Sequence, residues 1–418
     1  MQSSPRPPSR YTQEPEALSP LIADTGGLSH YARLVFQGAD LSSLWSDLAT
    51  RATAEPSDPG ALFDMSMLLQ LTGQVDQGLD IQSQALGQCR LYRRAFGDGS
   101  GLRVLVIMAA GGFMANTPLD FLLQGSDAVA TYLFITTGMG LSVDIPPHDV
   151  AVFAVGESDA HGSILQGFTP LAAAWPKPMI NGRPDRIALL TRDGVSTACA
   201  AIPQINAPAT VRLSRAALTA LAEGGSDLQA LLPGSTFPLI IRPVESHAGQ
   251  SLSKINTPKE LADYLDALPN LPQAYLTQFV DYSGGDNLFR KLRIAFIDGR
   301  PYIGHMAVSD HWMVHYLNAD MDHRPERRAE EAAMMASFNQ GFAQRHAEAF
   351  RALHAAIGLD YFAIDCAETS DGRLLLFEAD VAMILHDMDS EDLYPYKRAP
   401  MRRLFAGFQT YLSQLAQP

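Results

Sequence analysis

The chain has 418 residues, of which 47% are hydrophobic and 18% charged, a composition typical of a globular protein with two or three domains. Its formal net charge of −14 argues against nucleic acid or an anionic membrane as the main partner, because binding to phosphate groups requires a basic surface. No apolar run approaches the roughly 20 residues that span a bilayer, and the N-terminus lacks the apolar region of a secretory signal, so we expect a cytoplasmic protein.

Cysteine and lysine are both scarce. The three cysteines are too widely spaced for a metal or disulfide motif and indicate reduced, buried thiols: Cys89, Cys199 and Cys366. Nearly all basic residues are arginines, and this limits where lysine-dependent chemistry could operate. The lysines are Lys177, Lys254, Lys259, Lys291 and Lys397.

The N-terminal part predicts a tail followed by helices. Residues 1–27 are rich in Pro, Ser and Gly and are expected to be disordered. Residues 61–71 and 75–91 predict two helices joined at Thr72-Gly73-Gln74. A helix pair with a glycine at the turn resembles one tetratricopeptide unit, where an array needs about three. We therefore expect a small all-α helical domain at 28–98 that docks on a neighbour; a generic helical appendage is the alternative.

The periodicity changes at Gly101. Strand-length apolar runs occupy 102–108, 131–136 and 150–155, and 119–124 is helix-like. This alternation predicts an open α/β domain over 101–208 with a largely parallel sheet. Gly111-Gly112 follows the first strand but lacks the spacing of a phosphate loop, so a substrate-facing loop is favoured there.

Residues 209–418 carry antiparallel strand signals at 239–242, 274–280, 291–297 and 302–308, a long helix-like tract at 326–357 and a final hairpin at 361–382. Asp371-Gly372 predicts a two-residue type I′ turn in that hairpin. The pairing then places Asp365 directly opposite Glu378, with Asp380 on the same face. Cys366 would oppose Phe377 on the other, apolar face.

Three converging carboxylates predict a metal site, because like charges opposite one another destabilise a sheet unless they are neutralised. Mg²⁺ binds oxygen ligands of this kind and completes its shell with water and nucleotide phosphates. The alternative is a carboxylate that is solvated or paired with an arginine.

A second turn, Asp298-Gly299, places Lys291, Arg293 and Ala295 on one strand face. Such a cationic face suits the stabilisation of a transferring phosphoryl group, with a solvated basic strand as the alternative.

Histidines cluster at 305–323. His311 and His315 are spaced as metal ligands on a helix would be. The neighbouring Trp312 and Tyr316 indicate instead a loop that lines an acceptor pocket, and ordinary core or surface histidines are the third interpretation. His386 is a further pocket candidate.

The order of these pieces resembles the ATP-grasp superfamily, in particular the branch of glutathione synthetase and the ribosomal protein S6 glutamate ligase, over about residues 187–386. The resemblance implies that 240–243 and 246–251 close over the ATP phosphates and that 275–280 bind adenine through backbone groups. It implies catalytic roles for Lys291 and Arg293. The nucleotide-binding residues it implies are Arg192, Arg242, Ser246, His247, Gly249, Gln278, Phe279 and Val280, and the Mg²⁺ ligands are Asp365, Glu378 and Asp380.

The sequence departs from the family pattern at several of these positions. Arg242 and Arg192 stand where the family has lysines; arginine binds phosphate bidentately, but the two residues are not interchangeable. Asp380 replaces an asparagine, and Gln278 occupies a position that is often acidic.

The resemblance implies an α/β protein, α+β in its C-terminal part, with an ATP-grasp fold over 209–418 preceded by the open α/β domain. The implied activity is an ATP- and Mg²⁺-dependent carboxylate–amine (or thiol) ligase with an acyl-phosphate intermediate, for which Mn²⁺ could replace Mg²⁺. Its substrates would be small-molecule or peptide carboxylates and amines, with no nucleic acid or membrane, and a homodimer is compatible with the sequence. The alternative is a nucleotide-binding scaffold, or pseudoenzyme, whose helical domain recruits a protein.

Overall fold

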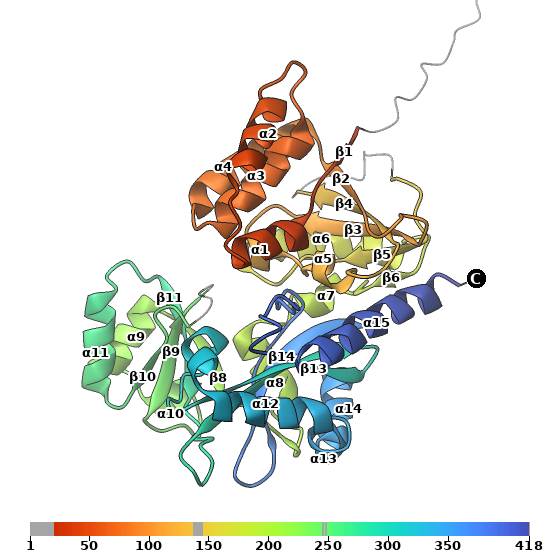
Figure 1. Ribbon diagram of the computed structural model, residues 1–418. Helices are drawn as coiled ribbons and strands as arrows, with labels where there is room; N and C mark the ends of the chain where they lie inside the picture. The colour runs from red at the N-terminus through yellow and green to blue at the C-terminus, as the bar shows by residue number, and fades with distance from the viewer. Residues whose placement is uncertain (1–20, 137–144, 245, 247–248, 418) are drawn as a thin grey trace, which may run out of the picture.

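The computed structural model describes residues 21–136, 145–244, 246 and 249–417 (Figure 1). The elements of its N-terminal half are β1 (Ile22–Asp24), α1 (Leu28–Phe36), α2 (Ser42–Ala52), α3 (Pro59–Leu71), α4 (Val75–Gln88), β2 (Leu91–Ala95), β3 (Arg103–Ala109), η1 (Phe113–Ala115), α5 (Leu119–Leu122), β4 (Val129–Ile135), β5 (Val150–Phe153), η2 (Asp159–His161), α6 (Gly162–Ala173), β6 (Met179–Ile180), α7 (Pro184–Ile187) and α8 (Arg192–Cys199).

The C-terminal half contains β7 (Ile205–Asn206), β8 (Thr210–Ser214), α9 (Arg215–Ala222), α10 (Leu228–Leu231), β9 (Leu239–Pro243), β10 (Ser253–Ile255), α11 (Pro258–Ala267), β11 (Gln273–Gln278), β12 (Phe289–Ile297), β13 (Arg300–Ser309), η3 (Tyr316–Asn318), η4 (Met321–His323), α12 (Pro325–Ser337), α13 (Phe342–Arg345), α14 (Ala347–Ile357), β14 (Tyr361–Glu368), β15 (Leu374–Asp380) and α15 (Arg398–Leu415). Among the helices that the structure describes, none combines the length and apolar character needed to cross a bilayer.

A six-stranded sheet forms the upper layer in Figure 1, in the order β1-β2-β4-β3-β5-β6. Its neighbours are parallel except for the β2–β4 pair, which confirms the largely parallel α/β sheet. Strand β3 reads as a continuous apolar run because both of its faces are covered. Leu105 and Ile107 pack towards α6, whereas Val104 and Val106 pack towards α1–α5.

The separate all-α N-terminal domain is not what the structure shows. β1 lies inside the expected tail of residues 1–27, whose first 20 residues are outside the described part of the chain. β2 lies inside the expected helical range 28–98, and it pairs with both β1 and β4. Helices α1 to α4 thus form an insertion between β1 and β2 of the six-stranded sheet. They are tied to it by apolar packing, including Phe63 of α3 stacked on Tyr92 of β2 at 4.3 Å between ring centroids.

The predicted helix pair itself is confirmed as α3 and α4. Asp58 caps α3, where its Oδ1 accepts hydrogen bonds from the backbone N–H groups of Gly60 at 2.8 Å and Ala61 at 3.2 Å. Gly73, with φ of +86°, makes the turn to α4. Helix α4 ends at Gln88, earlier than predicted, because the chain turns into β2. The resemblance to a tetratricopeptide unit stays a prediction.

Two sheets form the C-terminal half. The four-stranded sheet, β10-β9-β11-β8, is antiparallel throughout, and the five-stranded sheet has the order β13-β12-β14-β15-β7. β7 pairs in parallel with β15, although its residues fall in the range 101–208 that was assigned to the preceding domain. The chain thus contributes a strand to the five-stranded sheet before residue 208, and the domain boundary itself stays a prediction.

The predicted helix at 326–357 is wrong as a single element, because the tract divides into α12, α13 and α14. The first break falls at 338–341, where Asn339 and Gly341 are weak helix formers. α12 and α14 flank the five-stranded sheet in Figure 1.

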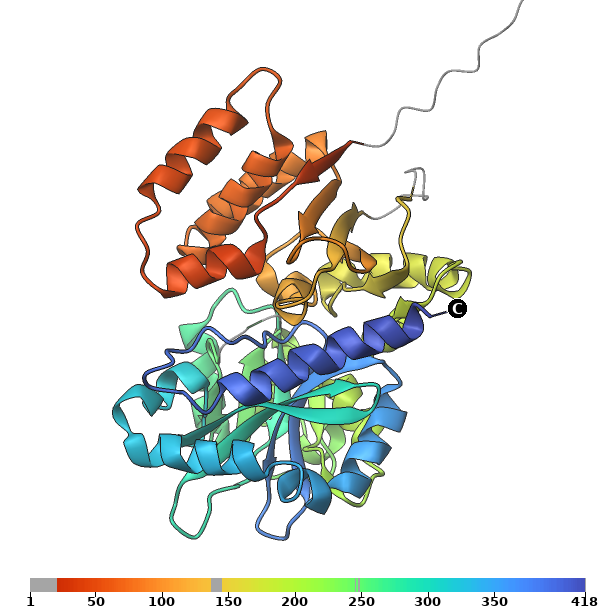
Figure 2. The ribbon, with the colours of Figure 1, turned by 45° about the vertical axis from the view of Figure 1, so that its right-hand side comes forward.

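Hydrogen bonds, an ion pair of Arg33 with Asp387 and a shared apolar core tie the upper half to the five-stranded sheet. Asn181, directly after β6, donates from Nδ2 to the carbonyl of Tyr361 at 2.7 Å and accepts from the N–H of Tyr361 at 2.9 Å. Helix α15 lies across the junction in Figure 2, and its Gln409 donates to the carbonyls of Leu122 and Gln124 at 3.1 and 2.8 Å.

Both predicted hairpins are present, with differences in detail. Asp298 and Gly299 have φ of +48° and +72° and connect paired Ile297 and Arg300, which confirms the two-residue turn. Farther along, a bulge at Gly304 pairs Arg293 with His305.

In the β14–β15 hairpin the turn is wrong, although the critical pair is correct. Thr369 and Arg373 close a three-residue loop, so the strands near the turn pair one residue out of the predicted register and Cys366 opposes Leu376. A bulge at Phe377 then restores the predicted register, and Asp365 lies opposite Glu378. The longer turn and the bulge, neither of which was predicted, shift the register in opposite directions, so the predicted pair of Asp365 and Glu378 is correct.

Candidate active site

The candidate site lies between the two C-terminal sheets. In β9, Leu239 and Ile241 are fully buried against α9 and α11, so by strand alternation Arg242 projects from the opposite face. Its guanidinium Nη1 lies 3.9 Å from the carboxylate of Glu378 on β15. Arg242 of the small sheet and Glu378 of the large sheet therefore face one another.

Asp365 is the most buried member of the site, at 1% exposure. Lys291 donates to its Oδ2 at 2.8 Å, while Arg293 donates to Oδ1 at 2.8 Å and to Oδ2 at 3.1 Å. Burial raises the pKa of Asp365, but the charges of Arg293 and Lys291 outweigh it and hold this pKa well below its usual range. The predicted cationic strand face is present, and its Lys291 and Arg293 bind the carboxylate of Asp365.

Glu378 pairs with Arg192, the first residue of α8. Thr191 starts that helix by accepting the N–H of Gly194 at 3.0 Å, which fixes where Arg192 leaves the backbone. Burial raises the pKa of Glu378, and the charges of Arg192, Arg242 and Lys291 together more than offset this, so the net shift is downward. Oε1 of Glu378 makes no hydrogen bond to a described residue.

Asp380 shares the face of Glu378, because both follow the same register against β14. Its Oδ1 accepts the N–H of Ala382 at 2.9 Å. Burial, with a contribution from the charge of Glu378, raises the pKa of Asp380 to about 6. Asp380 is thus the carboxylate whose charge the surrounding residues compensate least.

The cluster has one more positive than negative charge when all of its groups are ionised. Buried or half-buried cations fixed by carboxylates form a preorganised site for an anion, because they need little reorganisation when it binds. Its members are Arg192, Arg242, Lys291, Arg293, Asp365, Glu378 and Asp380.

The residues present fit magnesium through two carboxylates. Across the described ranges, no three His, Cys, Asp or Glu side chains gather as a ready metal site. Both oxygens of Asp365 are engaged by cations, whereas Glu378 and Asp380 each retain an oxygen without a hydrogen bond to a described residue. One or two protein carboxylates are the usual number for Mg²⁺ that also binds phosphates. A role for Asp365 as third ligand stays a prediction.

The segment between β9 and β10 is anchored to the cluster by Arg242. Its Nε donates to the carbonyl and to Oγ of Ser246, at 3.1 and 3.0 Å. Burial and then the charge of Arg192 lower the pKa of Arg242 to about 10. Gly249 lies against Met313, to which a methyl group on this glycine would approach within 3.4 Å. His247 lies outside the described residues.

The segment expected to bind adenine is tied to protein groups. The side-chain amide of Gln278 donates to the carbonyls of Phe279 and Pro238 at 2.9 and 3.3 Å and accepts from the N–H of Thr236 at 2.8 Å. Gln278 thus braces the end of β11. Nucleotide binding by Gln278, Phe279 and Val280 stays a prediction.

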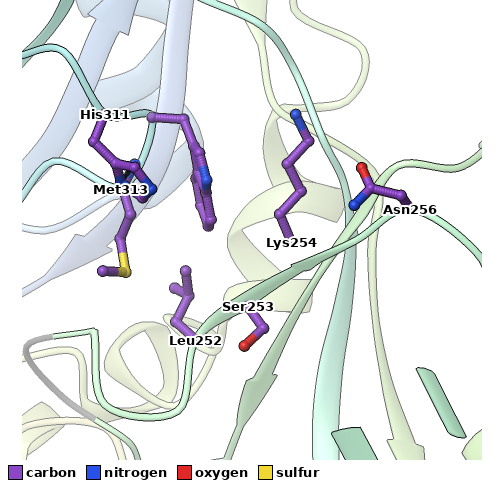
Figure 3. Close-up of a pocket in the computed structure, with 7 residues that line it drawn as sticks. Leu252, Ser253, Lys254, Asn256, His311 and Met313 are labelled. Atoms are coloured by element: carbon purple, nitrogen blue, oxygen red, sulfur yellow. Dashed lines mark hydrogen bonds between the residues drawn. The ribbon is translucent and has the colours of Figure 1, made fainter. Parts of the chain in front are cut away.

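Beside this segment is an open cavity of about 480 Å³. Figure 3 shows His311 and Met313 on one side, with Lys254 across from them and Leu252 below. The ammonium of Lys254 lies 3.7 Å from the centre of the Phe279 ring, which makes a cation–π contact.

The candidate histidines do not form one site. Residues 311–315 are not helical, which agrees with the loop favoured for this segment and argues against the alternative of a helical metal pair. His311 lines the open cavity. His315 lies nearer the cluster, and its pKa is lowered by burial and by the charges of Lys291 and Arg293. His386 instead lies near the rings of Phe36 and Phe121, at 6.1 and 6.2 Å between centroids.

The sequence indicated no role for Lys254 or Lys397, two of the five lysines. Lys254 borders the open cavity, and its position just after the small-residue loop was an available signal. Lys397 donates to Asp389 at 2.9 Å and lies over the ring of Tyr316. That tyrosine also donates to the fully buried Glu331 at 2.9 Å. No sequence spacing links these residues, which come from separate elements.

Comparison with known proteins gives remote similarities only. No family model and no curated protein matches the sequence. Solved structures that are similar include the D-alanine–D-alanine ligase of Bacillus anthracis complexed with ATP (12% identity, TM-score 0.43, 76% of this chain and 98% of that chain). Another is the VanG D-Ala:D-Ser ligase of Enterococcus faecalis (14% identity, TM-score 0.46, 76% of this chain and 100% of that chain). A third is a RimK domain protein ATP-grasp of Sphaerobacter thermophilus (12% identity, TM-score 0.39, 73% of this chain and 98% of that chain). At TM-scores below 0.5 these similarities do not establish a common fold, so the site is judged on its own residues.

Proposed function

We propose that this protein is an ATP-dependent ligase of the ATP-grasp type, which activates a carboxylate as an acyl phosphate and transfers it to an amine or a thiol. The observation that carries the proposal is the ion-pair cluster between the two C-terminal sheets. It combines excess positive charge for a triphosphate with two carboxylates, Glu378 and Asp380, that retain ligand oxygens for magnesium.

The basic residues would bind and orient the phosphates of ATP. Arg242 reaches the site from the small sheet and Arg192 from the start of α8, so a triphosphate between them would be held from two sides. Glu378 and Asp380 would hold magnesium, which neutralises phosphate charge when bound. Asp365 would keep Lys291 and Arg293 pointed at the transferring phosphoryl group.

In the reaction, an oxygen of the substrate carboxylate attacks the γ-phosphorus of ATP, and ADP leaves. The amine then attacks the acyl carbon, loses a proton and expels inorganic phosphate. Arg293 would stabilise the charge that develops in both steps, because its guanidinium is fixed before the substrate arrives. The segment anchored by Arg242 at Ser246 would exclude water and so protect the acyl phosphate.

A nucleotide-binding scaffold is the second candidate. It is favoured by one observation, namely that both oxygens of Asp365 are already engaged by Lys291 and Arg293. Lys291 and Arg293, held by Asp365 in this way, would leave Arg192 and Arg242 to bind a nucleotide without performing the transfer.

The test is Mg²⁺-dependent ATP binding and ADP release with a panel of carboxylates and amines, for the wild type and for Glu378→Gln. The ligase proposal expects wild-type turnover and a loss of about 100-fold or more in the variant, comparable to the loss of one transition-state contact. Glu391→Gln, which affects only an exposed pair with Arg398, is the matched control. Binding without ADP release would support the scaffold, and no Mg²⁺-dependent binding would contradict both.

A further inference from the structure

A second cavity lies in the upper half of the molecule, apart from the charged cluster. It has a volume of about 70 Å³ and lies between α3 and α4 on one side and the loop after β3 on the other. This loop follows the carboxyl end of a parallel strand, the usual position of ligand sites in open α/β sheets. The cavity is mainly apolar, with Phe63, Met67, Met108 and Phe134 in its wall.

The size of the cavity limits its occupant. On the scale where one water needs about 10–15 Å³, the space holds about five to seven waters. Sites for whole small-molecule ligands run to roughly 300–1,000 Å³. The cavity therefore suits a group as large as one side chain, not a complete nucleotide.

The charges around the cavity exclude an ionic occupant. Among the described residues, Asp120 is the one charged residue in its wall, and its carboxylate is already engaged by Arg94, by the hydroxyl of Tyr132 and by the N–H of Ser29 at 2.8 Å. No cationic side chain contributes to the wall within the described residues. An anion would find no partner, and a cation would have to displace Arg94, so the occupant is uncharged.

Two polar side chains in the wall lack partners. Gln70 is 6% exposed and its side-chain amide hydrogen-bonds to no described residue; a methyl group on Gly112 would lie 3.8 Å from its Oε1. Thr117 is 2% exposed and its hydroxyl is buried without a partner among the described residues. Leaving a buried hydroxyl unpaired costs about 1–3 kcal/mol, so Thr117 indicates a missing partner, and the amide of Gln70 in the same wall is available to bind one.

The cavity is separated from the charged cluster by one loop. Gln82 clamps Gly111 by accepting its N–H at 2.8 Å and donating to its carbonyl at 3.0 Å. On the other side of the same loop, a methyl group on Gly156 would lie within 3.3 Å of both the carbonyl of Ala115 and the Cβ of Ala382, two residues beyond Asp380. The loop thus has the cavity on one side and the segment that follows β15 on the other.

We propose that this cavity receives the uncharged side chain of an amino-acid or peptide substrate, with Gln70 and Thr117 as its polar contacts. The substrate class rests on the proposed ligase function, whereas the cavity itself can be tested without any turnover.

The experiment labels the methionine methyl groups with ¹³C and follows Met67 and Met108, which line the cavity, and Met335, a core residue away from it. The probes are leucine, methionine and glutamine, with glutamate as the charged counterpart of glutamine, each with and without ATP and Mg²⁺. We expect at least one neutral probe to shift Met67 and Met108 but not Met335, and glutamate to shift neither.

Two variants make the test specific. Gln70→Leu and Thr117→Val each remove one polar contact at similar volume and should weaken binding of the neutral probe about three- to tenfold, the worth of one hydrogen bond. Gln84→Leu, on the exposed face of α4, is the matched control and should bind as the wild type does. Equal shifts with glutamate, no shift with any neutral probe, or unchanged binding in both variants would overturn the proposal. ATP binding measured on the same samples reports separately on the ligase function.

Discussion

Asp365 and its two cations form an ion pair that cannot lose one partner without cost. Asp365 is 1% exposed, and Lys291 and Arg293 are both largely buried with it. Removing one partner of a buried pair leaves uncompensated charge, so Asp365→Asn should lower the free energy of unfolding by about 3–5 kcal/mol. Denaturant titration measures this, with Asp263→Asn, from the exposed pair with Lys259, expected to cost less than about 1 kcal/mol.

The pH dependence has a definite sign. Because the folded state depresses the pKa of Asp365 below its ordinary 3.8, its contribution is present above about pH 4 and is lost as the pH falls further. The difference between wild type and Asp365→Asn should therefore shrink in acid. A difference that grew in acid would contradict the ion-pair assignment.

Asp380 has the opposite dependence, because its pKa is raised from 3.8 to about 6. A raised pKa contributes stability below pH 3.8 that is lost as the pH rises through 6. In the absence of Mg²⁺ and nucleotide, Asp380→Asn should therefore be more stable than the wild type at pH 8, by up to about 3 kcal/mol, and equal to it near pH 4. Unfolding curves at the two pH values decide this; a destabilised variant at pH 8 would show that the carboxylate is compensated.

At the scale of elements, strand identity and face were predictable, and local irregularities were not. The carboxylates Asp365 and Glu378 were paired correctly from the turn at Asp371-Gly372, although that turn has three loop residues and a bulge follows it. The face of a strand and the position of a turn depend on residues that are neighbours in the sequence. A bulge depends instead on the side chains that pack against the strand, which come from distant parts of the chain. Arg192 and Arg242 could be named as site residues from the sequence. The carboxylate that each approaches could not, because it depends on how the two C-terminal sheets pack.

The bulge at Gly304 gives a prediction for the five-stranded sheet. A methyl group at this position would lie 2.3 Å from Leu385 Cδ2 and 3.3 Å from the carbonyl of Arg293. Gly304→Ala should therefore displace the buried Leu385 and cost about 1–3 kcal/mol by overpacking. Gly285→Ala, where nothing lies within 4 Å, is the control and should change stability by less than about 0.5 kcal/mol. Equal unfolding midpoints for the two variants would contradict the packing argument.

At the scale of the whole molecule, the N-terminal helices cannot be detached. Strand β2 supplies a partner to β4, and Phe63 and Tyr92 belong to the same apolar core as Val104 and Val106. A chain that begins at Gly99 should expose this face and lose cooperative unfolding, as followed by calorimetry. A truncated chain that unfolded in one sharp transition would restore the independent helical domain that the sequence predicted.

The pairing of Asn181 with Tyr361 has a mechanical consequence. It fixes the first residue of β14 to the end of β6, so the upper sheet and the five-stranded sheet form one rigid frame. The small sheet approaches the cluster of that frame at 3.9 Å, between Arg242 and Glu378, and it is also joined to the upper half by Arg212 of β8, whose Nη1 donates to Oδ1 of Asp159 at 2.7 Å. Any displacement of the small sheet from the other two sheets would therefore have to break the ion pair of Arg212 with Asp159, which makes this pair the latch between them.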